Sequence, residues 1–168
     1  MNIFFLSESP FEAAAMHNDM HVRKMLIESC QILCTTLHVI GEYSGEIPYK
    51  KTHENHPSVK WVRESNQNYL WLLTLSMYLL CEYEYRFEKK HKCEPVVDWL
   101  NSHLPKSLPN IPQTEFKLGF DINKYPECKH EDPIESYRLF YANHKKVWGK
   151  DNKPHTWTKR MVPFFMNN

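Results

Sequence analysis

The chain has 168 residues, a length typical of one domain with a single core. Its 21 Lys and Arg residues are balanced by 20 Asp and Glu residues, so the net charge of +1 creates no overall field that would draw the protein onto nucleic acid or an anionic membrane. With nine Tyr, nine Phe and five Trp against only four Gly, the composition excludes a disordered chain.

The five cysteines show no CxxC spacing, and Cys30 and Cys34 lie one helical turn apart, as small core residues do. This pattern favours a reducing compartment, so we expect a cytoplasmic protein. The opening "MNIFFLSESP" lacks the basic leader of a signal peptide. The apolar run "YLWLLTLSMYLLC" (69–81) is too short to cross a bilayer, and it predicts a buried core helix and no membrane partner.

In chain order, residues 3–6 form a short apolar segment that predicts a strand tucked into the core. Ser9, Pro10 and Glu12 have the spacing of a capping box with proline in the first helical position. A helix is therefore expected over 10–38, with room for one break, because no Pro or Gly interrupts the pattern before Gly41. The stretch 41–57 holds two Gly and two Pro and predicts a long loop.

The longest helical pattern, 57–91, predicts a central helix, and a shorter helix over 95–103 follows it. Residues 105–130 are rich in proline and predict an ordered but irregular excursion. Asp132 and Pro133 repeat the helix start signal, which predicts a closing helix over 133–148. The sequence thus predicts a mainly α fold in which residues 1–168 form a single-domain bundle of four or five helices around the central helix, without a substantial sheet.

A polar seam follows the first predicted helix. Steps of four, three, four and three residues place five side chains on one stripe: His17, His21, Lys24, Glu28 and Gln31. If the seam faces the interior, each member needs a partner, because an unpaired buried charge costs several kcal/mol. A cleft for a polar ligand would supply such partners. The alternative is a solvent-facing strip with an ordinary Lys24–Glu28 helical pair.

The loop "YKKTHENHP" supplies further candidates at Tyr49, Lys51, His53 and His56. Basic groups beside a proline-anchored helix start lie where backbone N–H groups converge, which favours an anion such as phosphate. We therefore expect these residues to bind a phosphate or a carboxylate.

The first part of the central helix places amide and hydroxyl groups next to aromatic rings, as suits a base or sugar edge. Its candidate binding residues are Trp61, Ser65, Asn68 and Tyr69. Because Ser and Asn are poor choices within a helix, a ligand would explain them, whereas the alternative is a solvated first third of a long helix.

Arg86 lies among Tyr83, Tyr85 and Phe87 and is expected to be partly enclosed, so it joins the candidate binding residues. The simplest interpretation of its surroundings is an ordinary helical ion pair with Glu82, one turn earlier.

A metal site is a minor alternative. His17 and His21 have the four-residue spacing seen in zinc sites, and Glu28 could add an oxygen. The HExxH pattern is absent, however, and Lys24 would repel a cation, so we expect no metal and no other cofactor. No glycine-rich phosphate loop, Rossmann fingerprint, GxSxG elbow or kinase motif occurs, which excludes those large enzyme classes.

Four motifs together carry a resemblance that covers nearly the whole chain: "HNDMHVRKMLIESCQIL", "YKKTHENHPSVKWVRESNQNYLWL", "EYEYR" and "YRLFY". The set is similar to a family of small, mostly helical proteins encoded by tailed phages, some large viruses and some bacteria. Phage genes of this size and polar signature often act in nucleotide metabolism, DNA base modification or counter-defence, and the resemblance implies that this gene lies among genes of these kinds.

Two hypotheses of function follow, and both use a pocket shared by the seam and residues 49–69. The first is a viral enzyme acting on a nucleotide or on a base in nucleic acid. His17 and His21 would act as acid and base, and Glu28 would orient one of them. Lys24, His53 and His56 would neutralise phosphate. The second is a nucleotide-binding protein without turnover, for example one that sequesters a signal of the host's defences.

A third and weaker hypothesis is a structural or partner-binding viral protein, in which the seam is ordinary surface. The sequence does not set the oligomeric state.

Overall fold

The computed structural model describes residues 1–43, 45–148 and 152–167. In these ranges the chain forms six α-helices, two short 3-10 helices and one pair of two-residue strands, so the prediction of a mainly helical fold is confirmed. The elements in chain order are α1 (Pro10–Met16), α2 (Asp19–Ile40), α3 (Pro57–Glu64), α4 (Asn66–Phe87), α5 (Glu94–Ser102), η1 (Pro126–Cys128), α6 (Pro133–His144), β1 (Val147–Trp148), β2 (Lys153–Pro154) and η2 (Phe164–Asn167).

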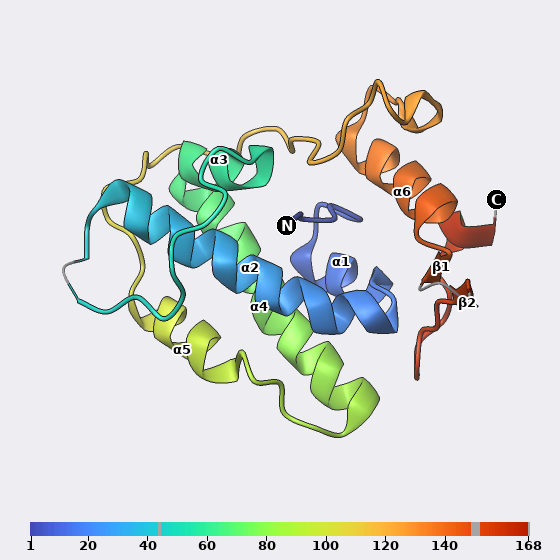
Figure 1. Cartoon of the computed structure of the whole chain (residues 1–168), viewed down its shortest axis with the longest axis horizontal. Helices are drawn as coiled ribbons and strands as arrows, with labels where there is room; N and C mark the ends of the chain where they lie inside the picture. The colour runs from blue at the N-terminus through green and yellow to red at the C-terminus, as the bar shows by residue number, and fades with distance from the viewer. Residues whose placement is uncertain (44, 149–151, 168) are drawn as a thin grey trace.

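The two long helices form the centre of the molecule. Figure 1 shows α2 crossing in front of α4, with α3 and α5 nearby and with α6 and the C-terminus on the right. β1 and β2 pair antiparallel beyond α6. No helix in the described part of the chain is long and apolar enough to cross a membrane.

The helix expected over 10–38 contains the one break for which the pattern left room, whereas the helix predicted as continuous over 57–91 is in fact two helices. Asn18 caps α2 by accepting a hydrogen bond from the backbone N–H of His21 at 2.8 Å, which ends α1 at Met16. Ser65 takes an extended conformation and accepts from the N–H of Asn68 at 3.0 Å, which separates α3 from α4. Both breaks occur at side chains that favour a helix start over a helix interior.

The C-terminal ends of two predicted helices were placed too late. α4 ends at Phe87 instead of residue 91, because Glu88 adopts a left-handed conformation with φ of 55° and its N–H donates to the carbonyl of Glu84. α6 ends at His144 instead of residue 148, and Val147 and Trp148 form β1. The helix predicted over 95–103 is shifted by a single residue.

The N-terminal segment 3–6 is buried, as predicted, but it is not a strand. The Phe5 ring packs against four other rings, with centroid distances of 4.8 Å to Trp61, 5.0 Å to Trp71, 4.3 Å to Phe116 and 5.4 Å to Tyr137. This irregular segment is therefore held by aromatic packing and not by a backbone ladder.

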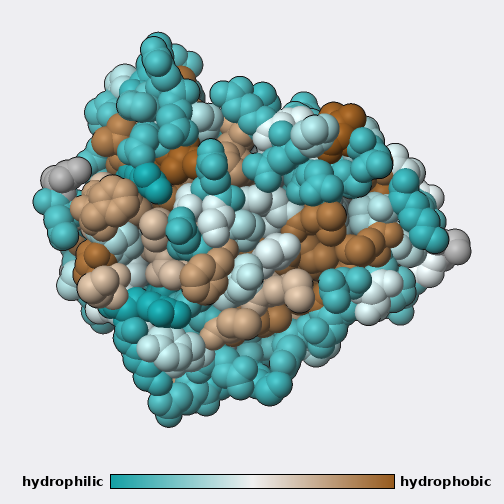
Figure 2. Space-filling model, turned by 180° about the vertical axis from the view of Figure 1, so that it is seen from behind, coloured by the Kyte–Doolittle hydropathy of each residue, from teal (hydrophilic) through white to brown (hydrophobic). Residues whose placement is uncertain are grey.

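One face of α4 is exposed, although the run 69–81 was predicted to be buried throughout. The exposed large hydrophobic side chains of α4 are Met77, Tyr78 and Tyr85. Figure 2 shows hydrophobic side chains gathered in a band on the face opposite to that of Figure 1.

The Pro-rich excursion between α5 and η1 is irregular and ordered, as predicted, and Asn68 of α4 anchors it. The Asn68 side chain donates to the Thr114 hydroxyl at 2.7 Å and accepts from the Thr114 N–H at 3.0 Å. Farther along, a Cβ atom at Gly119 would lie 2.1 Å from Oδ1 of Asn2, so a larger residue there would require the Asn2 side chain to move.

Candidate functional site

The seam begins at the break between α1 and α2, where His17 is completely buried. Its Nδ1–H donates to the carbonyl of Ala13 at 2.5 Å, and Nε2 has no hydrogen-bond partner in the described residues. Burial lowers the pKa of His17 to about 4. This ring is therefore neutral near pH 7, and it lines neither of the two cavities described below.

His21, one turn later, is also nearly buried. Its Nδ1 lies 2.7 Å from the Tyr141 hydroxyl, and its ring stacks on Phe4 with centroids 4.7 Å apart. Burial lowers the pKa of His21 to about 2, with a further contribution from His17. Tyr141 also accepts a hydrogen bond from the N–H of Asn18 at 2.9 Å. Both histidines are thus tied into the packing between α2 and α6.

Three seam residues line a cavity of about 430 Å³, which we call the charged cavity. α2 contributes His21, Lys24 and Glu28 to its lining. The segment before η1 contributes Asp121 and Lys124, and the residue after α6 is Lys145. Lysines thus outnumber carboxylates in the lining. Three α2 residues of the seam thus line this cavity.

Glu28 is the enclosed carboxylate of the charged cavity, with its side chain 12% exposed. It accepts a hydrogen bond from the Asn2 N–H at 2.7 Å. Lys24 Nζ lies 3.7 Å from its other oxygen, so the helical pair expected as the alternative is also present. Lys24 itself is 63% exposed and lies at the mouth of the cavity.

Lys145 is a member of this site that sequence reasoning missed. It caps the C-terminal end of α6 and is half-buried. Burial, and then the charge of Lys24, lowers the pKa of Lys145. Its ammonium group lies 5.2 Å from the centre of the Phe140 ring. The sequence feature that could have revealed Lys145 is its spacing from Tyr137 and Tyr141, because steps of four residues place all three side chains near one helical face.

A second and larger hollow of about 960 Å³, the basic groove, adjoins the charged cavity at Lys24. Its basic residues include Arg23, Lys24, Lys90 and Lys92, and Tyr83 and Phe87 supply aromatic surface. The Arg23 guanidinium lies 4.2 Å from the centre of the Phe87 ring, which is a cation–π contact. The groove therefore combines positive charge with flat apolar surface.

Tyr49 lines the basic groove, and its hydroxyl lies 3.5 Å from Sγ of Cys93. A hydrogen bond from Cys30, and a weaker one from Tyr49, lowers the pKa of Cys93. This thiol is a second groove residue that the sequence did not reveal, because Cys30 and Cys93 meet only in the fold.

Other loop candidates serve local structure and line neither the charged cavity nor the basic groove. Lys51 pairs with Glu54 at 2.8 Å, and the exposed His53 contacts the Thr52 hydroxyl at 2.6 Å. His56 caps α3 by accepting from the Ser58 N–H at 3.2 Å. Gln31 is half-buried farther along α2. The expected pocket that unites the seam with residues 49–69 therefore forms only in part, because Lys24 and Tyr49 line the basic groove together and the other candidates from 51–69 line neither hollow.

The four candidates on α3 and α4 belong to the core. Trp61 is completely buried, Ser65 caps α4, and the Asn68 amide is occupied by Thr114 and by the Trp61 carbonyl at 2.7 Å. Tyr69 is completely buried, and burial raises the pKa of its hydroxyl. The run of Ser and Asn is explained by a helix start and a loop anchor, so it needs no ligand.

Arg86 is more enclosed than expected, since its side chain is completely buried. It donates to Glu82 at 2.8 Å, to Asp19 at 3.2 Å and to the carbonyls of His17 and Ala15 at 2.7 and 2.8 Å. These bonds join α4 to the α1–α2 break, so Arg86 serves the structure of this junction.

The spacing of His17 and His21 predicted a possible metal pair, but each ring already uses Nδ1 within the protein, and their centroids are 6.5 Å apart. Among the described residues, a three-residue group with metal-ligand chemistry is formed instead by Glu127, Cys128 and His144.

No protein-family model, curated protein or solved structure matches this chain. The function is therefore inferred from the geometry of the charged cavity and the basic groove.

Proposed function

We propose that this protein binds a nucleotide, free or within a nucleic acid strand, and acts on it in the charged cavity. The observation that carries the proposal is the meeting of Glu28 and Lys145 in a cavity of about 430 Å³. A volume of about 300–1,000 Å³ is usual for small-molecule sites, and titratable groups with shifted pKa values tend to gather at such sites.

Lys145 and Glu28 are the proposed acid–base groups. The lowered pKa of Lys145 increases its neutral fraction near pH 7, and a neutral amine can accept a proton or attack an electrophilic carbon. Glu28 supplies an enclosed carboxylate of opposite charge. The buried histidines His17 and His21 are replaced in these roles, because their rings are neutral and each already has a protein partner at Nδ1.

The basic groove supports a strand as the ligand. Since the groove adjoins the cavity at Lys24, phosphates along the groove would meet Arg23 and Lys90 while one base enters the cavity. The rings of Tyr83 and Phe87 offer surfaces on which a base can stack. The sequence resemblance to phage and viral proteins favours viral or host DNA as the substrate, and the free cysteines suit the cytoplasm.

Fluorescence anisotropy with a short fluorescein-labelled single-stranded DNA tests binding. We expect Lys145→Met to weaken binding about tenfold, the equivalent of one favourable charge contact of about 1.4 kcal/mol. Lys60→Met is the matched control, since Lys60 is an exposed lysine on α3 that lines neither hollow. Equal effects of the two variants would contradict a site in the charged cavity.

Mass spectrometry of the same DNA after incubation tests turnover. We expect a change of mass with the unaltered protein that Glu28→Gln abolishes while binding persists. Binding without any change of mass would instead support the second hypothesis, a nucleotide-binding protein that sequesters its ligand.

A further inference from the structure

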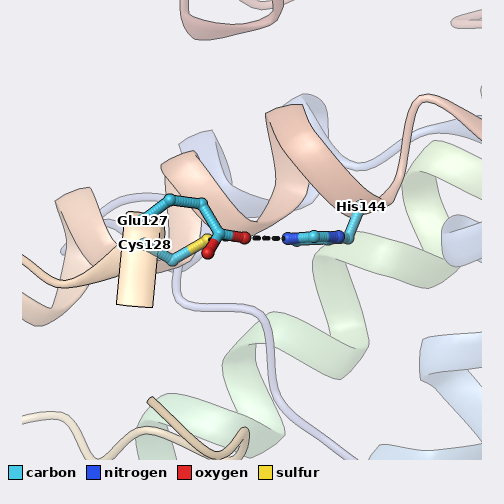
Figure 3. A group of neighbouring side chains, drawn as sticks. All are labelled: Glu127, Cys128 and His144. Atoms are coloured by element: carbon cyan, nitrogen blue, oxygen red, sulfur yellow. Dashed lines mark hydrogen bonds and ion pairs between the residues drawn. The ribbon is translucent and has the colours of Figure 1, made fainter. Parts of the chain in front are cut away.

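Three side chains with metal-ligand chemistry converge where η1 meets the end of α6. Glu127 and Cys128 belong to η1, and His144 is the last residue of α6. Nε2 of His144 lies 2.6 Å from Oε1 of Glu127, and the Cys128 thiol donates to that same oxygen at 3.8 Å. Figure 3 shows the imidazole and the carboxylate pointing toward each other, with the sulfur beside the carboxylate.

The donor set selects one class of ion. A thiolate, an imidazole nitrogen and a carboxylate oxygen together suit zinc, whereas magnesium and calcium prefer oxygen alone. The potential ligand atoms all lie within 4.8 Å of one another, so small side-chain movements would bring all three onto one small cation. We infer that Glu127, Cys128 and His144 form a zinc(II) site whose fourth position is taken by water.

Local electrostatics favour a cation at this place. His144 lies at the C-terminal end of α6, where the last backbone carbonyls form the negative end of the helix dipole. The carboxylate of Glu127 and the thiolate of Cys128 together balance the two positive charges of the ion.

Only a small movement is needed for the ion to enter. In a tetrahedral zinc site with zinc–nitrogen and zinc–oxygen bonds of about 2.0–2.1 Å, the nitrogen and oxygen ligand atoms lie about 3.3 Å apart. Nε2 of His144 and Oε1 of Glu127 now lie 2.6 Å apart, so these two atoms must separate before both can bind the ion. The Glu127 side chain is 49% exposed and can make this adjustment. Cys128 is buried and provides the fixed ligand.

Binding exchanges a proton for the ion. The Cys128 thiol loses its proton to solvent as the sulfur–zinc bond forms. The proton that Nε2 of His144 donates to Glu127 moves to Nδ1 or to solvent before the nitrogen–zinc bond forms, and no electron is transferred. Because burial raises the pKa of this thiol, protons compete with the metal, and affinity must fall on acidification. The ion would join η1 to α6 without using the charged cavity's Glu28 or Lys145.

Titration with cobalt(II) chloride in place of zinc tests the site, because a cobalt–thiolate bond gives an ultraviolet charge-transfer band. We expect one equivalent of cobalt to produce the band and zinc chloride to displace it. His144→Gln and Glu127→Gln should each weaken cobalt binding at least about tenfold, and both replace exposed side chains, so folding should be retained.

Cys128→Ser should remove the band, and Cys81→Ser, which alters an exposed cysteine of α4, is the matched control and should keep it. The site would be refuted by a titration of the unaltered protein that yields no band. It would also be refuted if the band survived His144→Gln at full affinity or disappeared in Cys81→Ser.

Discussion

Two charged regions lie close to α2, and they differ in how completely their charges are paired. The first, the buried ion network, consists of Asp19, Glu82, Arg86 and Arg160. Each guanidinium nitrogen of Arg86 has an acceptor, and Glu82 also accepts from Arg160 at 2.5 and 3.1 Å. The Thr158 hydroxyl and N–H donate to Asp19. The network thus closes on itself within the protein.

The second region, the charged cavity, is open and incompletely neutralised. Its three lysines, Lys24, Lys124 and Lys145, exceed its two carboxylates, and Lys24 is largely exposed beside Glu28. Burial and the charge of Lys24 act against the protonated form of Lys145. A cluster whose charged groups are paired with one another stabilises a fold, whereas a cluster with unpaired excess charge around a cavity is suited to binding a ligand of opposite charge.

The largest expected effect is on stability and comes from breaking the buried ion network. Arg86→Met removes one donor from each of the Asp19 and Glu82 carboxylates and the side-chain donor of two buried backbone carbonyls, which should cost about 3–5 kcal/mol of unfolding free energy. Urea denaturation measures the change. Lys90→Met, which removes an exposed pair with Glu94, is the control and should cost less than about 1 kcal/mol. Similar losses in both variants would contradict the distinction between the two regions.

An intermediate effect is expected from pH. His17 has its folded pKa lowered to about 4 from 6.5, so below pH 6.5 the unfolded chain takes up a proton that the folded chain does not. Stability is therefore complete above pH 6.5 and falls as the pH drops toward 4, by about 2 kcal/mol at pH 5 from this residue alone. His21 acts in the same direction down to about pH 2.

Urea denaturation at several pH values compares the unaltered protein with His17→Gln. The variant should lose less stability between neutral and mildly acidic pH, since the titrating ring is gone. Parallel pH profiles would show that His17 does not remain neutral in the folded protein.

The smallest expected effect on stability is at the edge of the charged cavity. Lys24→Gln removes an exposed helical pair with Glu28, worth no more than about 0.5 kcal/mol. Binding of the labelled DNA should nevertheless weaken severalfold, and the log–log salt slope should fall by about 0.7 if Lys24 contacts one phosphate. Lys60→Gln should change neither quantity. A large loss of stability without a loss of binding would place Lys24 among the structural charges.

Much of the fold could be predicted because the helix starts carry local signals. Ser9 before Pro10 and Asp132 before Pro133 cap α1 and α6 where expected. The break at Ser65 was missed, although its side chain caps α4, because the surrounding polar run was interpreted as a ligand-binding surface. Interpreting each Ser or Asn first as a possible cap would have divided the helix correctly.

The candidate site could be predicted only in part. Helical spacing correctly placed Lys24 and Glu28 on one face, because that relation depends on residues four apart. The neutrality of His21 depends on its burial against Phe4 and Tyr141, and the lowered pKa of Lys145 depends on burial and then on Lys24. Such contacts join distant parts of the chain, and no periodicity within a single helix encodes them.

The buried segment 3–6 has a consequence for the order of events during translation. The Phe4 ring packs against His21 and also against Tyr137, Phe140 and Tyr141 of α6, with a centroid distance of 5.2 Å to Tyr141. These α6 rings leave the ribosome long after residue 4 does. The Phe4 side chain therefore cannot reach these partners until α6 has been synthesised, so this part of the core closes late.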